Sequence, residues 1–131
     1  MSLSSNNWIK FYKSSPDSKA TLPVRATNGA AAYDLMATSF HLFDKPDNPD
    51  YPSMYYSYIR FHTGLSVVIP PNFVGDLRAR SSSHKLGLYL VNGAGVIDSD
   101  YRGEIIAIYR RNKNIDWTEA MEIIKKPIAQ I

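Results

Sequence analysis

The chain has 131 residues, enough for one domain with a modest hydrophobic core, and its 44% hydrophobic and 21% charged residues are ordinary for a globular protein. The net charge is only +3 and basic residues form no more than short pairs, which does not favour a nucleic-acid-binding protein. The absence of cysteine excludes a disulfide framework, a thiolate zinc site and a cysteine nucleophile.

Short apolar runs separated by turn-forming residues predict an all-β chain. Nine tyrosines favour half-buried strands, and eight prolines mark loops and strand edges. In chain order, strands are expected at residues 8–13, 55–61, 65–69, 73–80, 88–91 and 104–109. Strands of this length, separated by turns, are typical of an antiparallel barrel or sandwich.

Four segments interrupt this pattern. Residues 44–52 contain three prolines, three aspartates and an asparagine, and we expect them to form a surface excursion. Residues 81–86 have room for one helical turn that Gly87 would end. Residues 112–114 read Asn-Lys-Asn and indicate a turn. Residues 117–125 are the one helical candidate, although a loop followed by a strand fits them equally well.

The segment around residues 88–108 carries the most distinctive chemistry. Its glycines permit close approach by a ligand, and a flat uncharged ring can pair edge-on with backbone groups there. Asn92 adds an amide that both donates and accepts hydrogen bonds. Asp98 and Tyr101 then place a base and a stacking face in one loop. Alternatively, Asp98 and Asp100 only bond the local backbone of a hairpin, and the residues alone leave both readings open.

A second cluster reads Arg80-Ser81-Ser82. A guanidinium can grip a phosphate with two hydrogen bonds, and the hydroxyls are further donors. Either serine can instead be the N-cap of a helical turn, and because so short a string is common, that interpretation is favoured.

Asp34 lies among apolar residues. It can approach a metal through water, or it can be an acid that is hydrogen-bonded for structural reasons, and in isolation the structural role is favoured.

The order of these clusters resembles the trimeric dUTPase family. Residues 31–35 resemble its first motif, residues 70–82 its second, residues 92–104 its third and residues 128–131 its fourth. The third motif is specific, whereas the first and fourth are weak alone. The resemblance implies a distorted jelly-roll-like β-barrel of the β-clip type and a homotrimer with sites at subunit interfaces. It also implies hydrolysis of dUTP to dUMP and pyrophosphate with Mg²⁺, which limits uracil in DNA and supplies dUMP.

The resemblance also implies roles for single residues of the third motif. Tyr101 would pack on the deoxyribose and exclude a 2′-hydroxyl. Asp98 would deprotonate the water that attacks the α-phosphate. The uracil edge would form hydrogen bonds with the side-chain amide of Asn92 and with the backbone of Gly95, Val96 and Ile97.

The other motifs would handle the phosphates. By resemblance, Arg80, Ser81 and Ser82 would hold phosphate oxygens, from a neighbouring subunit. Asp34 and Gln130 would act nearby through water, metal or phosphate. No residue is expected to bind the metal directly, and Asp34 would approach it through water. The partners implied are dUTP, dUMP and further copies of the chain, with no nucleic acid and no membrane. No signal peptide or membrane-spanning stretch is visible, and we expect a soluble protein in the cytoplasm or another intracellular compartment, the nucleus included if the source is eukaryotic or viral.

The chain also departs from the family pattern. Ala32 stands where the family has glycine, and Pro127 removes a backbone N–H, so strand pairing at that edge is in doubt. The family continues past its fourth motif into a last strand and a glycine-rich arm, whereas this chain stops at Ile131. We therefore expect residues 1–131 to form a single dUTPase-like domain without that strand and arm. If the arm is absent, nucleotide binding should persist with weakened turnover.

Two alternatives to a dUTP diphosphatase remain. The first is a noncatalytic or weakly active module that binds deoxyuridine nucleotides on the same scaffold. The second is the related dCTP deaminase, which needs a glutamate where this chain has Ile108, a side chain that cannot activate water. The sequence therefore favours the diphosphatase.

Overall fold

Ten short strands, one α-helix and one 3-10 helix form the part of the chain that the computed structural model describes, residues 9–43 and 56–131. The first five strands are β1 (Lys10–Lys13), β2 (Asp34–Leu35), β3 (Ser39–Phe43), β4 (Tyr56–His62) and β5 (Leu65–Val68). The later strands are β6 (Gly75–Leu77), β7 (Leu88–Leu90), β8 (Gly95–Ile97), β9 (Ile106–Ile115) and β10 (Ala129–Gln130). The helices are η1 (Ser83–Leu86), of the 3-10 type, and α1 (Trp117–Ile123).

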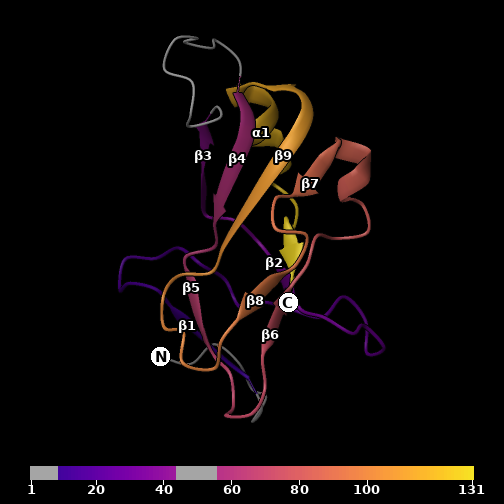
Figure 1. Cartoon of the computed structure of the whole chain (residues 1–131). Coiled ribbons are helices and arrows are strands. Elements are labelled where there is room, and N and C mark those ends of the chain that lie inside the picture. The colour runs from indigo at the N-terminus through magenta and orange to yellow at the C-terminus, as the bar shows by residue number, and fades with distance from the viewer. Residues whose placement is uncertain (1–8, 44–55) are drawn as a thin grey trace.

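All strand pairs within these ladders are antiparallel. One four-stranded sheet has the order β3-β4-β9-β7, and three two-stranded ladders join β1 to β5, β2 to β10 and β6 to β8. Figure 1 shows the four-stranded sheet above the ladders β1–β5 and β6–β8, with α1 beside its upper end. The expected all-β architecture is confirmed, although the described strands do not close into one continuous barrel.

Alternating burial along the strands builds the core. In β6, β7 and β8 the outer residues of each three-residue strand are buried and the central residue is exposed. The inward side chains join a single cluster in which Phe11, Leu35, Phe61 and Tyr109 are 0% exposed. Burying an apolar side chain of this size stabilises the fold by about 1.5–3 kcal/mol. The core therefore fixes the strands from which the exposed loops project.

All six expected strand segments contain a strand, although the bounds differ and β9 runs six residues past its expected end. Four further strands, β2, β3, β8 and β10, lie outside the segments expected to be strands. In β8, two buried positions flank an exposed one, a run too short to show alternation. The expected excursion at residues 44–52 lies outside the described residues, as do residues 8 and 55 of the expected strands.

The turn expected at residues 112–114 is wrong, because β9 runs through it. Tyr58 pairs with Arg110 and Tyr56 with Ile115, so β9 advances five residues while β4 advances two. An irregularity of this kind lets extra residues bulge out of a ladder without ending the strand. Ile115 is fully buried beyond the bulge and keeps the strand anchored.

Both candidate helical segments contain a helix, so the alternative of a loop followed by a strand at residues 117–125 is wrong. Gly87 ends η1 in the left-handed conformation at φ 67°, which a residue with a side chain adopts at a cost. The side chain of Asp116 accepts from the Glu119 amide at 2.8 Å and begins α1. Arg111 on β9 forms an ion pair with Glu119, and this pair ties the helix to the sheet. No helix among the described residues is long and apolar enough to span a membrane.

The last strand is held in place by contacts that do not need an amide at Pro127. The Ile128 amide donates to Leu35 at 2.8 Å, and Gln130 exchanges backbone hydrogen bonds with Arg78 at 2.8 and 2.9 Å. The pairing doubted because of Pro127 is therefore intact at the following residues. The hydroxyl of Tyr109 also donates to the Ile128 carbonyl at 2.7 Å. Burial raises the pKa of Tyr109 from about 10 to about 12, so the hydroxyl remains a donor well into the alkaline range.

Tyr109→Phe tests this link. The change leaves the ring in place but deprives the buried Ile128 carbonyl of its donor, so the free energy of unfolding should fall by about 1–2 kcal/mol. Urea denaturation at neutral pH measures the loss. Tyr89→Phe is the matched control, since Tyr89 is 53% exposed on neighbouring β7. A loss below about 0.5 kcal/mol would show that the hydroxyl does not hold β10 in place.

Candidate functional site

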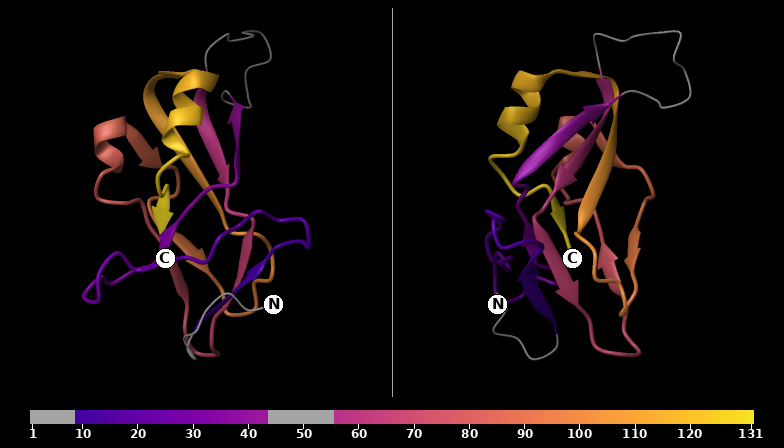
Figure 2. Two further views of the ribbon diagram at one scale, coloured as in Figure 1. Left: turned by 180° about the vertical axis from the view of Figure 1, so that it is seen from behind. Right: turned by 90° about the vertical axis from the view of Figure 1, so that its left-hand side faces the viewer.

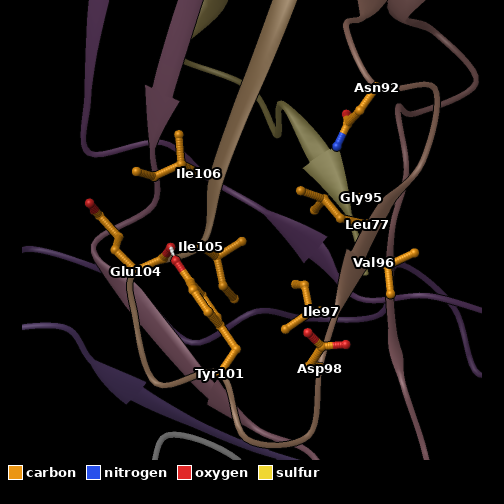
Figure 3. A pocket seen from close by; sticks show the side chains of 10 residues that line it. All are labelled: Leu77, Asn92, Gly95, Val96, Ile97, Asp98, Tyr101, Glu104, Ile105 and Ile106. Carbon is orange, nitrogen blue, oxygen red and sulfur yellow. Dashed lines mark hydrogen bonds between the residues drawn. The ribbon is translucent and has the colours of Figure 1, made fainter.

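A pocket of about 190 Å³ opens between β8, the loop that follows it and the beginning of β9. Figure 3 shows ten side chains around it, with Asn92 at one end, Asp98 and Tyr101 at the other, and the apolar Leu77, Ile97 and Ile105 between them. The pocket thus gathers Asn92, Gly95, Val96, Ile97, Asp98 and Tyr101, six of the residues expected from the third motif.

The backbone of β8 forms one wall. Among the described residues β8 pairs only with β6, so alternate backbone groups on its other edge face away from any strand. Gly95 packs closely on β6, since a Cβ there would lie 3.1 Å from that of Leu77 and 3.5 Å from Asn92 Nδ2. The turn before it contains Gly93 at φ 69°. The glycines therefore allow the turn and the close packing that leave this edge accessible.

Tyr101 is clamped against its own loop. Its hydroxyl donates to the Glu104 carbonyl at 2.8 Å, and its amide donates to the Asp98 carbonyl at 3.0 Å. A Cβ on Gly103 would lie 2.5 Å from the hydroxyl and 2.7 Å from the ring carbon that bears it. In this position the ring leaves no room for a side chain at residue 103. Asp98, also exposed, lines the pocket beside it.

Glu104 and its partners were not expected to have roles. The carboxylate of Glu104 accepts from the Gly64 amide at 2.8 Å and lies 3.0 Å from His62 Nδ1. Gly64 adopts φ 68° in the turn between β4 and β5, which brings that amide within reach. His62 is 42 residues away along the chain, so no local pattern connects it to Glu104. The only sequence signal for this contact was the position of Glu104, an acid at the start of the strand expected at residues 104–109.

The residues expected to hold phosphate form a second cluster outside the pocket. Arg80 donates through Nε to Asp34 at 3.2 Å and through Nη1 to the Pro127 carbonyl at 3.3 Å. The side-chain amide of Gln130 donates through Nε2 to the Ala79 carbonyl at 3.1 Å, and Gln130 pairs with Asp34 in the β2–β10 ladder. Asp34 thus makes the structural bond considered from the sequence, and its partner is the arginine of the second motif.

Ser81 and Ser82 lie exposed between this cluster and η1. Ser82 occupies the N-cap position of η1 but makes no side-chain capping bond, so the capping role is not fulfilled. None of the five phosphate candidates lines the pocket, which within one chain contains no lysine or arginine. Within the described residues, no three His, Asp or Glu side chains group as a metal site.

A larger cavity of about 540 Å³ lies elsewhere, on the side of β6 near the C-terminus. It is mainly apolar, with Ile9, Phe73 and Val74 among its lining residues. Its two charged residues, Asp76 and Arg78, pair with each other at 2.9 Å. This cavity lacks an unengaged base beside a stacking ring, and the smaller pocket is therefore the better candidate for chemistry.

The dUTPase family model matches residues 18–125, which include the whole pocket and most of the second cluster. The chain belongs to the dUTPase family. The family expected from the four motifs is therefore confirmed, and the dCTP deaminase alternative receives no support. The roles of individual residues remain predictions.

Individual proteins similar to this chain are also dUTPases. The deoxyuridine 5'-triphosphate nucleotidohydrolase of Orientia tsutsugamushi (strain Boryong) is 33% identical over 115 residues, 85% of this chain and 72% of the relative. The solved dUTPase of Streptococcus mutans is 26% identical with a TM-score of 0.61, over 83% of this chain and 80% of that one. A mutant dUTPase of S. aureus phage phi11, described as coordinating a structural Mg(II) ion, shares the fold with a TM-score of 0.62 at 24% identity, over 81% and 61%. The chain spans between 56% and 72% of the length of the curated relatives compared.

Gly103→Ala tests the clamp on Tyr101. The added methyl group overlaps the tyrosine ring, which can swing away, so the hydroxyl should leave the Glu104 carbonyl while the free energy of unfolding changes by less than about 1 kcal/mol. A crystal structure of the variant and urea denaturation measure the two effects. Gly29→Ala is the control, because a Cβ there meets nothing within 4 Å. A ring that keeps its position in Gly103→Ala would contradict the close packing.

Proposed function

We propose that this chain hydrolyses dUTP to dUMP and pyrophosphate, a reaction that limits uracil in DNA and supplies dUMP. The observation that carries the proposal is a single pocket, in a member of the dUTPase family, that combines an accessible strand edge with Asp98 and Tyr101. These features match the base, the sugar and the reacting water of one substrate. Its mixed polar and apolar lining suits the nucleoside part of a nucleotide.

Uracil is recognised by the wall that β8 and Asn92 form. The ring presents two carbonyl acceptors and one N–H donor, which complement backbone N–H and C=O groups of Gly95, Val96 and Ile97 and the amide of Asn92. Cytosine presents an amino group in place of one carbonyl, so a backbone donor would face another donor. A site that binds its substrate through such groups rejects an analogue strongly, because buried partners are left unpaired.

The sugar and the reacting phosphate are handled by the following loop. Tyr101 packs on the deoxyribose, where a 2′-hydroxyl would collide with the ring. Asp98 accepts a proton from water, whose oxygen attacks the α-phosphorus. The bond from that phosphorus to the oxygen bridging the α- and β-phosphates breaks, and pyrophosphate leaves with the bond's electron pair. The ring of Tyr101 contacts the sugar and the carboxylate of Asp98 activates the water, so both side chains are needed in the same pocket.

The triphosphate needs positive charge from outside the pocket. The pocket lining includes the carboxylates of Asp98 and Glu104 and no basic side chain, an unfavourable setting for four negative charges. Arg80, with Ser81 and Ser82 beside it, supplies the complementary donors, and Asp34 and the Pro127 carbonyl orient its guanidinium. The Gln130 side chain binds the carbonyl of the preceding residue, Ala79. We propose that a homotrimer brings this cluster from a neighbouring subunit to the pocket.

Magnesium is compatible with this donor set. Mg²⁺ usually keeps several waters and binds through substrate phosphates with only one or two protein carboxylates, so it needs no cluster of protein ligands. Asp98 and Asp34 would reach such an ion through water, and no residue binds it directly in this proposal. When bound, the ion neutralises charge on the phosphates and on the leaving pyrophosphate.

Asp98→Asn tests the reaction. The amide cannot accept the water's proton, so kcat for dUTP should fall by about 10²–10⁴-fold while the affinity for the nucleotide changes little. Pyrophosphate release in the presence of Mg²⁺ gives kcat, and calorimetric titration with a non-hydrolysable dUTP analogue gives the affinity.

Asp100→Asn is the matched control, because Asp100 is an exposed acid of the same loop that does not line the pocket. It should retain nearly full turnover. Normal turnover by Asp98→Asn would remove Asp98 from its role. Absence of turnover in the unmodified protein, with analogue binding preserved, would instead favour a noncatalytic nucleotide-binding module.

A further inference from the structure

We propose that Glu104 and His62 position Tyr101 and thereby set the preference for deoxyribose over ribose. The inference rests on the proposed function, in which Tyr101 contacts the sugar. It concerns two residues that do not themselves need to touch the nucleotide. Tyr101 is the contact, and Glu104 and His62 act through it.

Tyr101 depends on one hydrogen bond for its place. Its side chain is 43% exposed, and an exposed aromatic side chain normally exchanges between rotamers. Here the hydroxyl donates to the Glu104 carbonyl at 2.8 Å, and the ring lies over Gly103. Any movement of that carbonyl therefore moves the ring or releases it.

The Glu104 carbonyl belongs to a peptide group that is held from its opposite side. In a trans peptide the C=O and the following N–H point in opposite directions. The Ile105 amide donates to the Leu65 carbonyl at 2.7 Å, so the Glu104 carbonyl points away from β5 and toward Tyr101. The Ile105 carbonyl in turn accepts from Thr63 Oγ1 at 2.7 Å in the buried interior. These bonds hold one end of the peptide group.

The Glu104 side chain holds the other end. Both oxygens of its carboxylate are engaged, one by the Gly64 amide at 2.8 Å and one by His62 Nδ1 at 3.0 Å. Glu104 and His62 are only 25% and 29% exposed, so water screens the contact less than at an open surface. With both ends fixed, the carbonyl cannot rotate about its backbone axis, and the ring of Tyr101 stays where a 2′-hydroxyl would collide with it.

Loosening this support should change discrimination more than turnover. A deoxyribose fits beside the ring whether the ring is fixed or mobile, whereas a ribose fits only if the ring can retreat. The hydrolysis of UTP should therefore rise relative to that of dUTP when Glu104 or His62 loses its hydrogen bonds. A purely structural role would lower both rates together and leave their ratio unchanged.

Four variants test the inference through the ratio of kcat/KM for dUTP to kcat/KM for UTP. Glu104→Ala removes both bonds and His62→Phe removes one while keeping a ring, and each should lower the ratio by roughly fivefold or more, the order that one hydrogen bond supports. Glu104→Gln retains an acceptor for Gly64 and a donor for His62, and should stay within about twofold of the unmodified protein. Tyr101→Ala removes the ring itself and should lower the ratio the most.

The controls separate the possible failures. His41→Phe removes a histidine of β3, the strand beside β4, whose ring centroid lies 6.2 Å from that of Phe43. The ratio for this variant should equal that of the unmodified protein. A constant ratio in both Glu104→Ala and His62→Phe, while Tyr101→Ala lowers it, overturns the inference and leaves the proposed function standing. An equal loss in Glu104→Gln overturns the hydrogen-bond explanation. If Glu104→Ala fails to fold, His62→Phe decides the matter, and absence of dUTP hydrolysis in the unmodified protein removes both proposals.

Discussion

The docking of residues 104–105 onto the turn between β4 and β5 is the contact on which the site depends. Ile105 is 1% exposed and exchanges backbone hydrogen bonds with Thr63 and Leu65. This contact leads the chain from the pocket loop into β9, one of the two inner strands of the largest sheet. Through Glu104 it also fixes the acceptor of the Tyr101 hydroxyl. An exposed loop thereby obtains its shape from a buried backbone contact.

The same architecture divides the chemistry between two regions of the chain. The pocket around β8 offers hydrogen-bonding partners, a ring and a base, but no cation. The cluster of Arg80, Asp34 and Gln130 is assembled by the β2–β10 ladder and its bridge to Arg78, which join chain segments far apart in sequence. A pocket that holds the base-binding groups and the carboxylate, together with a separate cluster that holds the cation, is the arrangement expected for a site completed between subunits, as proposed here.

The sequence predicted local features better than long-range contacts. Gly87 was predicted to end a helical turn because of its own conformational freedom, whereas residues 117–125 were left open between a helix and a loop followed by a strand. The resemblance of residues 92–104 to the third dUTPase motif named residues that the structure brings to one pocket, because they are contiguous in the chain, and their roles remain predictions. The turn at residues 112–114 was wrong because tertiary pairing with β4 carries a polar stretch through a bulge. The contact between His62 and Glu104 was missed because it joins residues 42 positions apart.

The central claim is that the free edge of β8 reads the base. The direct measurement is a titration of the isotope-labelled protein with dUMP, followed through the backbone amide resonances. The account predicts that Gly95, Val96 and Ile97 shift most, together with the Asn92 side-chain amide, and that dCMP at equal concentration produces much smaller shifts. Shifts confined to the apolar cavity of Ile9, Phe73 and Val74, or equal responses to the two nucleotides, would contradict it.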